Sequence, residues 1–292
     1  MPINARDLLK GYVEVASLPV IHSRLNEAIN NPKKSMSDIA KIIREDAGLT
    51  ARILRIVNSA FYNFPSKVET ISQAVTIIGT QQLGAISLAT SVMSLFKGIP
   101  KDFVDMDSFW RHSVTCGVTA RILAGLRREP NPERFFVAGI LHDIGRIILY
   151  TKNPDQARES LLLAKSREKL LYEAEMEVMG FTHASVGGLL LEFWKLPSSL
   201  EEMVMYHHNP GGASRFPVDA AVIHVADVIA HTLYHGSSGE RFVPPLNTEA
   251  WDRLGLSPTI LGATLDDVEH QFEDAMHTIG PDGEHERIPG NS

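Results

Sequence analysis

Apolar residues recur at three- and four-residue spacing along nearly the whole chain, and strand-like alternation is weak throughout. This spacing places apolar side chains on one face of a helix, so the pattern predicts an all-α protein. In the first hundred residues, breaks in the pattern separate successive helices. These helices are predicted at 5–16, from about 20 to Asn30, from Asp38 with Ser37 as cap, from Leu49 to Asn58, from Thr70 to Gly79, and at 81–97.

The segment Lys97-Gly98-Ile99-Pro100-Lys101 interrupts the helical pattern and predicts a junction between two lobes, 1–98 and 99–245. Helices of the second lobe are predicted from Asp107 to Leu126, Asn131 to Tyr150, 155 to 178, Thr182 to before Pro197, Ser198 or Ser199 to His208, and Pro217 to Gly236. After a loop at 237–247, helices at 248–255 and 264–279 are expected to dock on the core as a unit spanning 246–279. The polar tail at 280–292 is predicted to be disordered.

A histidine and an aspartate stand side by side in the apolar helical run from Gly139 to Leu149. Burying His142 and Asp143 there costs free energy unless both polar groups are satisfied. Two interpretations follow. The pair forms a hydrogen-bonded element of the core, or it binds a metal ion, whose charge exceeds that of any side-chain partner. The metal interpretation requires further ligands elsewhere in the chain.

Further residues of ligand type lie in the other apolar helices. With the first pair they form a set of seven on five predicted helices: His112, His142, Asp143, His183, His207, His208 and Asp227. Imidazole and carboxylate donors together suit iron, manganese, zinc or nickel, and we favour iron or manganese. Seven groups exceed what one ion needs, so the set predicts one or two divalent transition metal ions. Paired ions about 3.5–4 Å apart can hold a phosphate and activate a water.

Three more histidines share a helical face with Asp227, namely His224, His231 and His235. They would be extra ligands or a proton relay in one interpretation. In the plainer interpretation, which we favour, His224 supports the ligands and the other two face solvent. The first hundred residues contain no comparable cluster of ionisable groups, so we predict no chemistry before residue 100.

The net charge of -7 disfavours a nucleic-acid-binding role that depends on a basic surface. A DNA-binding helix-turn-helix at 36–58 is also disfavoured, because Ala40 and Gly48 are too far apart for its turn. Cys116 is the single cysteine, which excludes an intrachain disulfide, and its apolar setting predicts a core residue. The N-terminal sequence lacks the apolar core of a signal peptide and no run of 18 apolar residues exists. The chain is therefore predicted to be cytoplasmic and without a membrane span.

The order of His112, His142-Asp143 and Asp227 resembles the HD superfamily of metal-dependent phosphohydrolases. His183 and His207-His208 resemble the dinuclear branch that includes the HD-GYP cyclic dinucleotide phosphodiesterases. Over about residues 10–235 the chain is more specifically similar to the HDOD domain, the HD-related output domain, which implies a two-lobed helical HD-like fold. The motifs that carry this similarity are Ser17 to Val20, Asp38-Ile39-Ala40, Leu49-Thr50, Val57 to Tyr62, Ile71 to Val75, Phe109 to Ser113, Gly139 to Gly145, and Trp194 to Pro197.

This resemblance implies a bacterial-type signal-transduction module that acts through protein partners, with a nucleotide or cyclic dinucleotide as candidate ligand. Three positions depart from the HD-GYP pattern. Ser108 replaces a glutamate one turn before the first histidine, Arg146 replaces a phosphate-facing lysine, and the segment 209–212 replaces the Gly-Tyr-Pro loop. These changes predict weak or absent catalysis, with Arg146 as the candidate phosphate contact. An active phosphohydrolase is the alternative, and a purely structural scaffold is the third interpretation.

Overall fold

The computed structural model of the chain describes residues 4–10, 20–59, 62, 64–96 and 103–279. Within these residues the regular elements are α-helices and two short 3₁₀ turns, with no strand, which confirms the all-α prediction. The predicted junction at 97–101, the predicted disordered tail at 280–292 and residues 11–16 of the first predicted helix lie outside the described residues.

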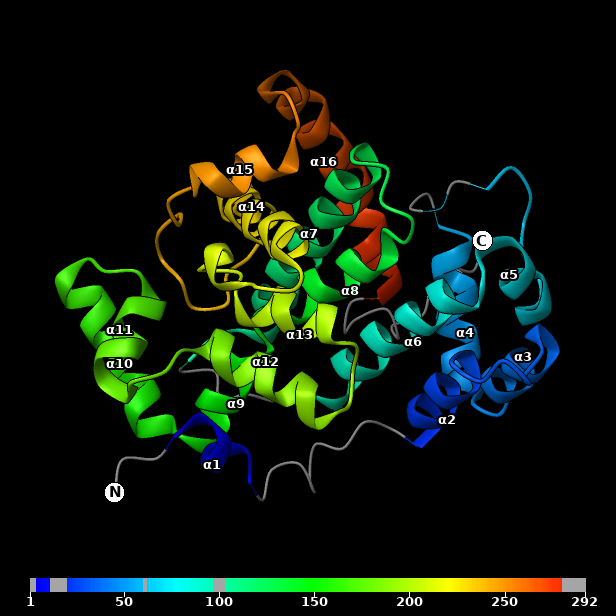
Figure 1. Cartoon of the computed structure of the whole chain (residues 1–292), viewed down its shortest axis with the longest axis horizontal. Helices are drawn as coiled ribbons and strands as arrows, with labels where there is room; N and C mark the ends of the chain where they lie inside the picture. Colours follow the sequence, from blue (N-terminus) through cyan, green and yellow to red (C-terminus); the bar gives the residue numbers. More distant parts are fainter. Residues whose placement is uncertain (1–3, 11–19, 60–61, 63, 97–102, 280–292) are drawn as a thin grey trace, which may run out of the picture.

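The N-terminal half places a group of short helices on one side of the molecule (Figure 1). The group contains α2 (Val20–Ile29), α3 (Met36–Arg44), α4 (Ala47–Val57), α5 (Ile71–Ile78) and α6 (Thr80–Leu95), and the remaining helix of this half is α1 (Ala5–Leu9). Helix α6 connects this group to the rest, because it packs against α2, α4 and α5 on one side and against α8 of the second half on the other. Helix α1 lies apart from the group and packs on α12.

The second half is built around α7, which packs against α8, α14 and α16 (Figure 1). Its helices are α7 (Met106–Leu126), α8 (Glu133–Leu141), α9 (Ile144–Lys152), α10 (Pro154–Arg167), α11 (Leu171–Met179), α12 (His183–Phe193), α13 (Ser198–Met205), α14 (Pro217–Leu233), α15 (Thr248–Leu254) and α16 (Leu261–Ile279). The 3₁₀ turns are η1 (Pro210–Gly212) and η2 (Pro258–Ile260). Helix α16 also packs on α4, and one continuous apolar core spans both halves. The division into lobes stays a prediction.

Helices α3, α5 and α7 each begin at a residue whose side chain caps the helix N-terminus, and two of these N-cap residues differ from the predicted ones. The cap of α3 is Ser35 and not Ser37, because Ser35 and Asp38 form a reciprocal capping box. The cap of α7 is Asp105 and not Asp107, since the Asp105 side chain accepts the backbone N–H of Ser108. Thr70 caps α5 as predicted.

Two predicted helices are each divided in the structure. The helix predicted from Asn131 to Tyr150 is α8 and α9, with His142 and Asp143 in the turn between them. The long helix predicted at 155–178 is α10 and α11, and the chain reverses at Glu168, which has a φ of 50°. Each break redirects the chain, so that α9 packs on α12 and α11 packs back on α10.

A close approach of α7 and α8 brings the first two predicted ligands together. A Cβ atom on Gly139 would lie 2.6 Å from the backbone nitrogen of Gly117, so only glycine permits this helix spacing. The spacing sets the His112 and His142 rings 5.2 Å apart between centroids. Among the described residues no single helix is long and apolar enough to span a membrane, although α5 with most of α6 passes that test as a sharply bent pair.

Candidate metal centre

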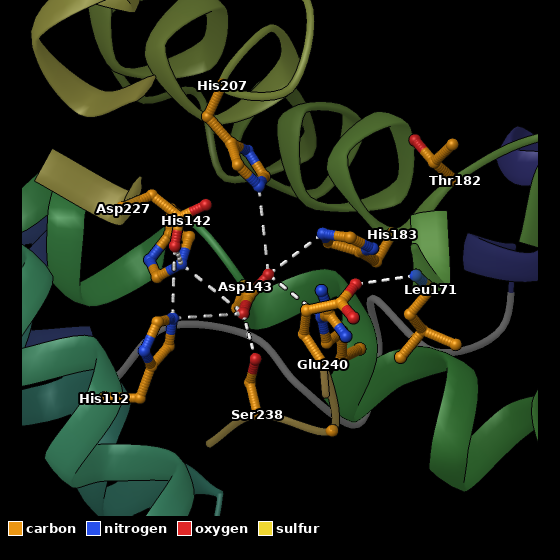
Figure 2. Close-up of polar contacts among 12 residues, drawn as sticks. His112, His142, Asp143, Leu171, Thr182, His183, His207, Asp227, Ser238 and Glu240 are labelled. Carbon is orange, nitrogen blue, oxygen red and sulfur yellow. Dashed lines mark hydrogen bonds and ion pairs between the residues drawn. The ribbon is translucent and has the colours of Figure 1, made fainter. Parts of the chain in front are cut away.

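All seven predicted ligand residues meet in one largely buried cluster, although they come from five separate parts of the chain. Figure 2 labels all of them except His208. His112 comes from α7, His142 and Asp143 from the α8–α9 turn, and His183 from the start of α12. His207 and His208 follow α13, and Asp227 lies on α14. The four histidines His112, His142, His183 and His207 have no exposed surface, and the two aspartates are 1% exposed.

The first half of the cluster surrounds one oxygen of Asp227. Its Oδ1 atom lies 3.2 Å from Nε2 of His112, 3.3 Å from Nε2 of His142 and 3.3 Å from Nε2 of His231. The prediction that His231 faces solvent is therefore wrong, because this side chain is 7% exposed and turned toward Asp227. Its position one helical turn after Asp227 on α14 explains the contact.

The second half of the cluster surrounds one oxygen of Asp143. Its Oδ1 atom lies 2.9 Å from Nε2 of His183 and 3.8 Å from Nε2 of His207. His208 completes this half, with its Nε2 atom 3.1 Å from Nε2 of His183. Asp143 also reaches the first half, since its Oδ2 atom is 3.4 Å from Nε2 of His142. One carboxylate therefore connects both groups of histidines.

Hydrogen bonds at Nδ1 orient three of these imidazoles. Nδ1 of His142 lies 2.6 Å from the carbonyl oxygen of Gly139, and Nδ1 of His207 lies 2.7 Å from that of Val204. Since a carbonyl only accepts, each Nδ1 carries a proton and donates it, and Nε2 is the nitrogen that faces the cluster. This is the arrangement of metal-binding histidines whose other nitrogen is held by the surrounding protein.

Glu175 does the same for His183, and the sequence interpretation missed it. Its Oε2 atom accepts from Nδ1 of His183 at 2.6 Å and from the backbone N–H of His183 at 2.8 Å. Glu175 lies in the helix predicted at 155–178, to which no site was assigned, and it is only 2% exposed. The sequence does contain an indication that Glu175 is buried. It stands four residues after Leu171 and one after Ala174, which places it on the apolar, buried face of α11.

Part of the cluster carries the protonation states that metal binding requires, whereas His142 and His183 must lose a proton, because neighbouring acidic groups outweigh burial and raise the pKa of both. Burial lowers the pKa of His207 to about 3 and that of His231 to about 3, so both imidazoles are neutral at pH 7. Burial alone would raise the pKa of Asp143. The Arg146 guanidinium and the neighbouring imidazoles outweigh that effect and hold the pKa of Asp143 well below its ordinary value. The carboxylate is ionised.

Several ligand atoms have no hydrogen-bond partner among the described residues, although they are buried. They are Nε2 of His142 and His207, both ring nitrogens of His112, and Oδ1 of Asp227. Buried polar atoms without partners are costly, and cations held in the cluster would satisfy those that face it, which excludes Nδ1 of His112. Two nitrogens bound to one ion at about 2.1 Å stand roughly 3.4 Å apart in tetrahedral geometry, close to the spacings here. The donor set therefore fits divalent metal ions.

A short segment between α14 and α15 closes the cluster on one side, and it lies in the stretch predicted only as a loop. We call Ser237 to Glu240 the strap. The Ser238 hydroxyl donates to Oδ2 of Asp143 (Figure 2), and the Ser238 carbonyl accepts from the Tyr150 hydroxyl at 2.9 Å. Ser108, where the HD-GYP pattern has glutamate, accepts the Ser237 N–H with its side-chain oxygen at 2.9 Å.

Arg146 lies directly behind Asp143. Its Nε atom donates to Oδ1 of Asp143 at 3.0 Å, and the guanidinium is fully buried. Its two remaining nitrogens have no hydrogen-bond partner among the described residues. Its role as a phosphate contact stays a prediction.

The other two histidines of α14 have structural partners. Nδ1 of His224 donates to the His207 carbonyl at 2.8 Å and Nε2 accepts from the Asn247 N–H at 2.9 Å, so His224 supports a ligand segment as expected. His235 stacks on Phe272 and contacts Glu269, and is thus only partly solvent-exposed.

A buried cluster of histidines and aspartates within an all-α fold is the arrangement that the resemblance to the HD superfamily leads us to expect. A profile of the HDOD domain matches residues 15–210, well over half of the chain. The chain therefore belongs to the HDOD domain family. An uncharacterised protein of Treponema pallidum (strain Nichols) is 22% identical over 200 residues. The match covers 67% of this chain but only 38% of that curated relative's length.

Three solved structures share the fold. An HDOD domain protein of unknown function from Geobacter sulfurreducens has a TM-score of 0.76 at 24% identity, covering 94% of this chain and 95% of the other. A candidate phosphohydrolase from Shewanella amazonensis SB2B has a TM-score of 0.72 at 24% identity, covering 93% and 96%. A candidate signal transduction protein from Marinobacter aquaeolei VT8 has a TM-score of 0.71 at 21% identity, covering 93% and 60%.

Proposed function

We propose that this chain is an HDOD-type regulatory module that acts through protein partners in a signalling pathway and holds a dinuclear metal centre with weak or absent catalysis. The observation that carries this proposal is the closure of the cluster. Four of its histidines have no exposed surface, and both oxygens of Asp143 already contact protein groups, the Ser238 hydroxyl and the Arg146 guanidinium. Of the seven ligand residues only His208 is partly exposed, so little of the cluster is open to a substrate phosphate in this conformation.

The residues divide naturally between two ions. The first ion would take His112, His142, His231 and Asp227, and the second would take His183, His207 and His208, with Asp143 shared. His231 then supplies the donor that the absent glutamate at position 108 would have provided. Imidazole nitrogens suit iron, zinc or nickel and carboxylate oxygens suit manganese, and among these ions we favour iron or manganese. When bound, such a pair would supply Lewis-acid stabilisation and a fixed positive charge.

The second candidate function is a metal-dependent phosphohydrolase acting on a nucleotide or cyclic dinucleotide. The position of Asp143 between the two groups of histidines favours it, because a shared carboxylate could hold paired ions, the arrangement used for phosphate ester hydrolysis. The two unpartnered nitrogens of Arg146 are donors of the kind that bind phosphate oxygens. This function requires the strap to move, since Ser238 occupies the side of Asp143 that faces the first half of the cluster.

A turnover assay separates the two functions. Metal-loaded protein is incubated with cyclic and linear nucleotides, and we expect turnover well below about 1 s⁻¹, the low end for enzymes. His142→Ala and Asp143→Ala serve as controls that remove ligand atoms. Faster turnover that both controls abolish would contradict the regulatory assignment and establish the hydrolase.

A further inference from the structure

A partly polar cavity whose lining includes none of the metal ligands lies between the two halves of the molecule. Its volume is about 200 Å³, and its walls come from α2, α6, α8 and the start of α13. Its lining includes His22 and Asn26 on α2, Ala85 on α6, Asn131 and Val137 at α8, and Leu200 on α13. No chemistry was predicted for the N-terminal lobe, and His22 belongs to that lobe.

Two buried polar groups in this cavity have no partner among the described residues. Both ring nitrogens of His22 lack a hydrogen bond, and the side chain is 5% exposed. The Oδ1 atom of Asn131, across the cavity on the other half of the molecule, is also buried and unpartnered. Unsatisfied atoms of this kind are costly, and two that line one cavity indicate a ligand that bonds to both.

The chemistry of the walls restricts that ligand. Burial lowers the pKa of His22 to about 4, so the imidazole is neutral, with one donor and one acceptor nitrogen. Arg134 also lines the cavity, but its charge is compensated by Asp219 and by Glu129, whose Oε2 lies 3.3 Å from Nη2. The interior is therefore neutral, which disfavours a charged group inside it. The ligand must offer an acceptor and a donor to His22 and a second donor to Asn131.

The volume of the cavity and the groups in its walls indicate which class of ligand it could hold. A cavity of about 150 Å³ accommodates a single benzene ring, so about 200 Å³ has room for a fused two-ring heterocycle. The walls combine side-chain amides with apolar groups such as Ala85, Val137 and Leu200. Asparagine side chains pair with the edges of nucleobases, and apolar groups contact their faces.

We propose that the cavity between α2, α6, α8 and α13 binds a neutral purine base, held at its edge by His22 and Asn131, with any sugar at the cavity mouth. This site also lies where it would influence the metal centre. Val137 is on α8 and Leu200 is on α13, and the ends of these two helices orient His142 and His207 through the Gly139 and Val204 carbonyls. The purine would thus be the input signal of the regulatory module, a part of the inference that rests on the proposed function.

Isothermal titration calorimetry of the full chain with adenosine, guanosine and uridine tests the site. We expect one purine nucleoside to bind with a Kd on the order of 100 µM or tighter, and uridine to bind about tenfold more weakly because one ring fills less of the cavity. His22→Leu keeps the bulk of the side chain and should weaken purine binding about tenfold. Ala85→Leu fills the cavity and should abolish binding. Ser23→Ala, exposed on the same helix, is the matched control and should change nothing.

The result that would overturn the site is purine nucleoside binding no tighter than about 1 mM, or tighter binding that persists unchanged in both His22→Leu and Ala85→Leu. Since His22 has no native hydrogen bond to lose, its leucine variant should fold, which circular dichroism checks. Metal release to a chelator is measured in parallel and should slow at least threefold with the purine bound. An unchanged release rate would overturn the input role alone. Protein that binds purine but never holds metal would overturn the proposed function and leave the cavity assignment standing.

Discussion

Replacing Asp143 with asparagine is expected to remove metal from both halves of the centre and to destabilise the metal-free protein by about 3–5 kcal/mol. The loss of both ions follows from the position of Asp143, whose two oxygens face the two groups of histidines. The loss of stability follows because Arg146, fully buried against Asp143, keeps its charge without a carboxylate partner. Metal content of loaded protein and urea unfolding of chelator-treated protein measure the two effects separately.

Two further variants make this prediction specific. Asp227→Asn changes an oxygen that contacts only the first group of histidines, so it should remove one ion and leave the other. The double variant Asp143→Asn/Arg146→Met removes the unpaired guanidinium, and should recover much of the stability without recovering metal. Asp143→Asn protein that retains both ions would contradict the bridging role. A double variant no more stable than the single one would contradict the electrostatic explanation.

The second large effect is expected at Gly145, in the first turn of α9. A Cβ atom there would lie 2.0 Å from the His183 carbonyl oxygen and 2.7 Å from the Gly187 nitrogen, both rigid backbone atoms of α12. Gly145→Ala should therefore separate α9 from α12 and destabilise the protein by about 3 kcal/mol or more. Because α9 begins directly after Asp143 and α12 begins at His183, the second metal should also bind more weakly.

Gly125→Ala is the matched control for this substitution. Gly125 lies in the last turn of α7 with no atom within 4 Å of an added Cβ, so alanine should stabilise the protein by about 0.5–1 kcal/mol. Thermal and urea unfolding of both variants give the comparison. Equal stability of the two alanine variants would show that the α9–α12 contact is looser than the structure indicates.

The ligand residues could be predicted from the sequence because each one is a polar group set in an apolar helical pattern. His112 and Asp227 stand on long helices whose buried faces are clear, and the pattern alone places them inside. The adjacent His142 and Asp143 were found for the same reason, but the helix break between them was not. The apolar run continues through Gly145 without a proline, and the bend depends on the contact of α9 with α12, which is a tertiary effect.

The supporting residues were harder to predict, and the reason is physical. Ser238 lies in an irregular segment, where no periodicity marks a buried face, and only its contact with Asp143 shows its place. His231 shares a helix with Asp227, and solvent was favoured because the partners that bury it, such as His112, come from another helix. His22 stands alone in its lobe, and its burial between α2 and the second half is visible only in the assembled fold.

The most direct test of the metal centre is elemental analysis of folded, purified protein produced in metal-replete medium. The account predicts two divalent transition metal ions per chain, with iron or manganese favoured. It also predicts that the Asp227→Asn variant holds one. Folded wild-type protein that contains no stoichiometric transition metal would contradict it, because the buried nitrogens and oxygens of the cluster would then need another explanation.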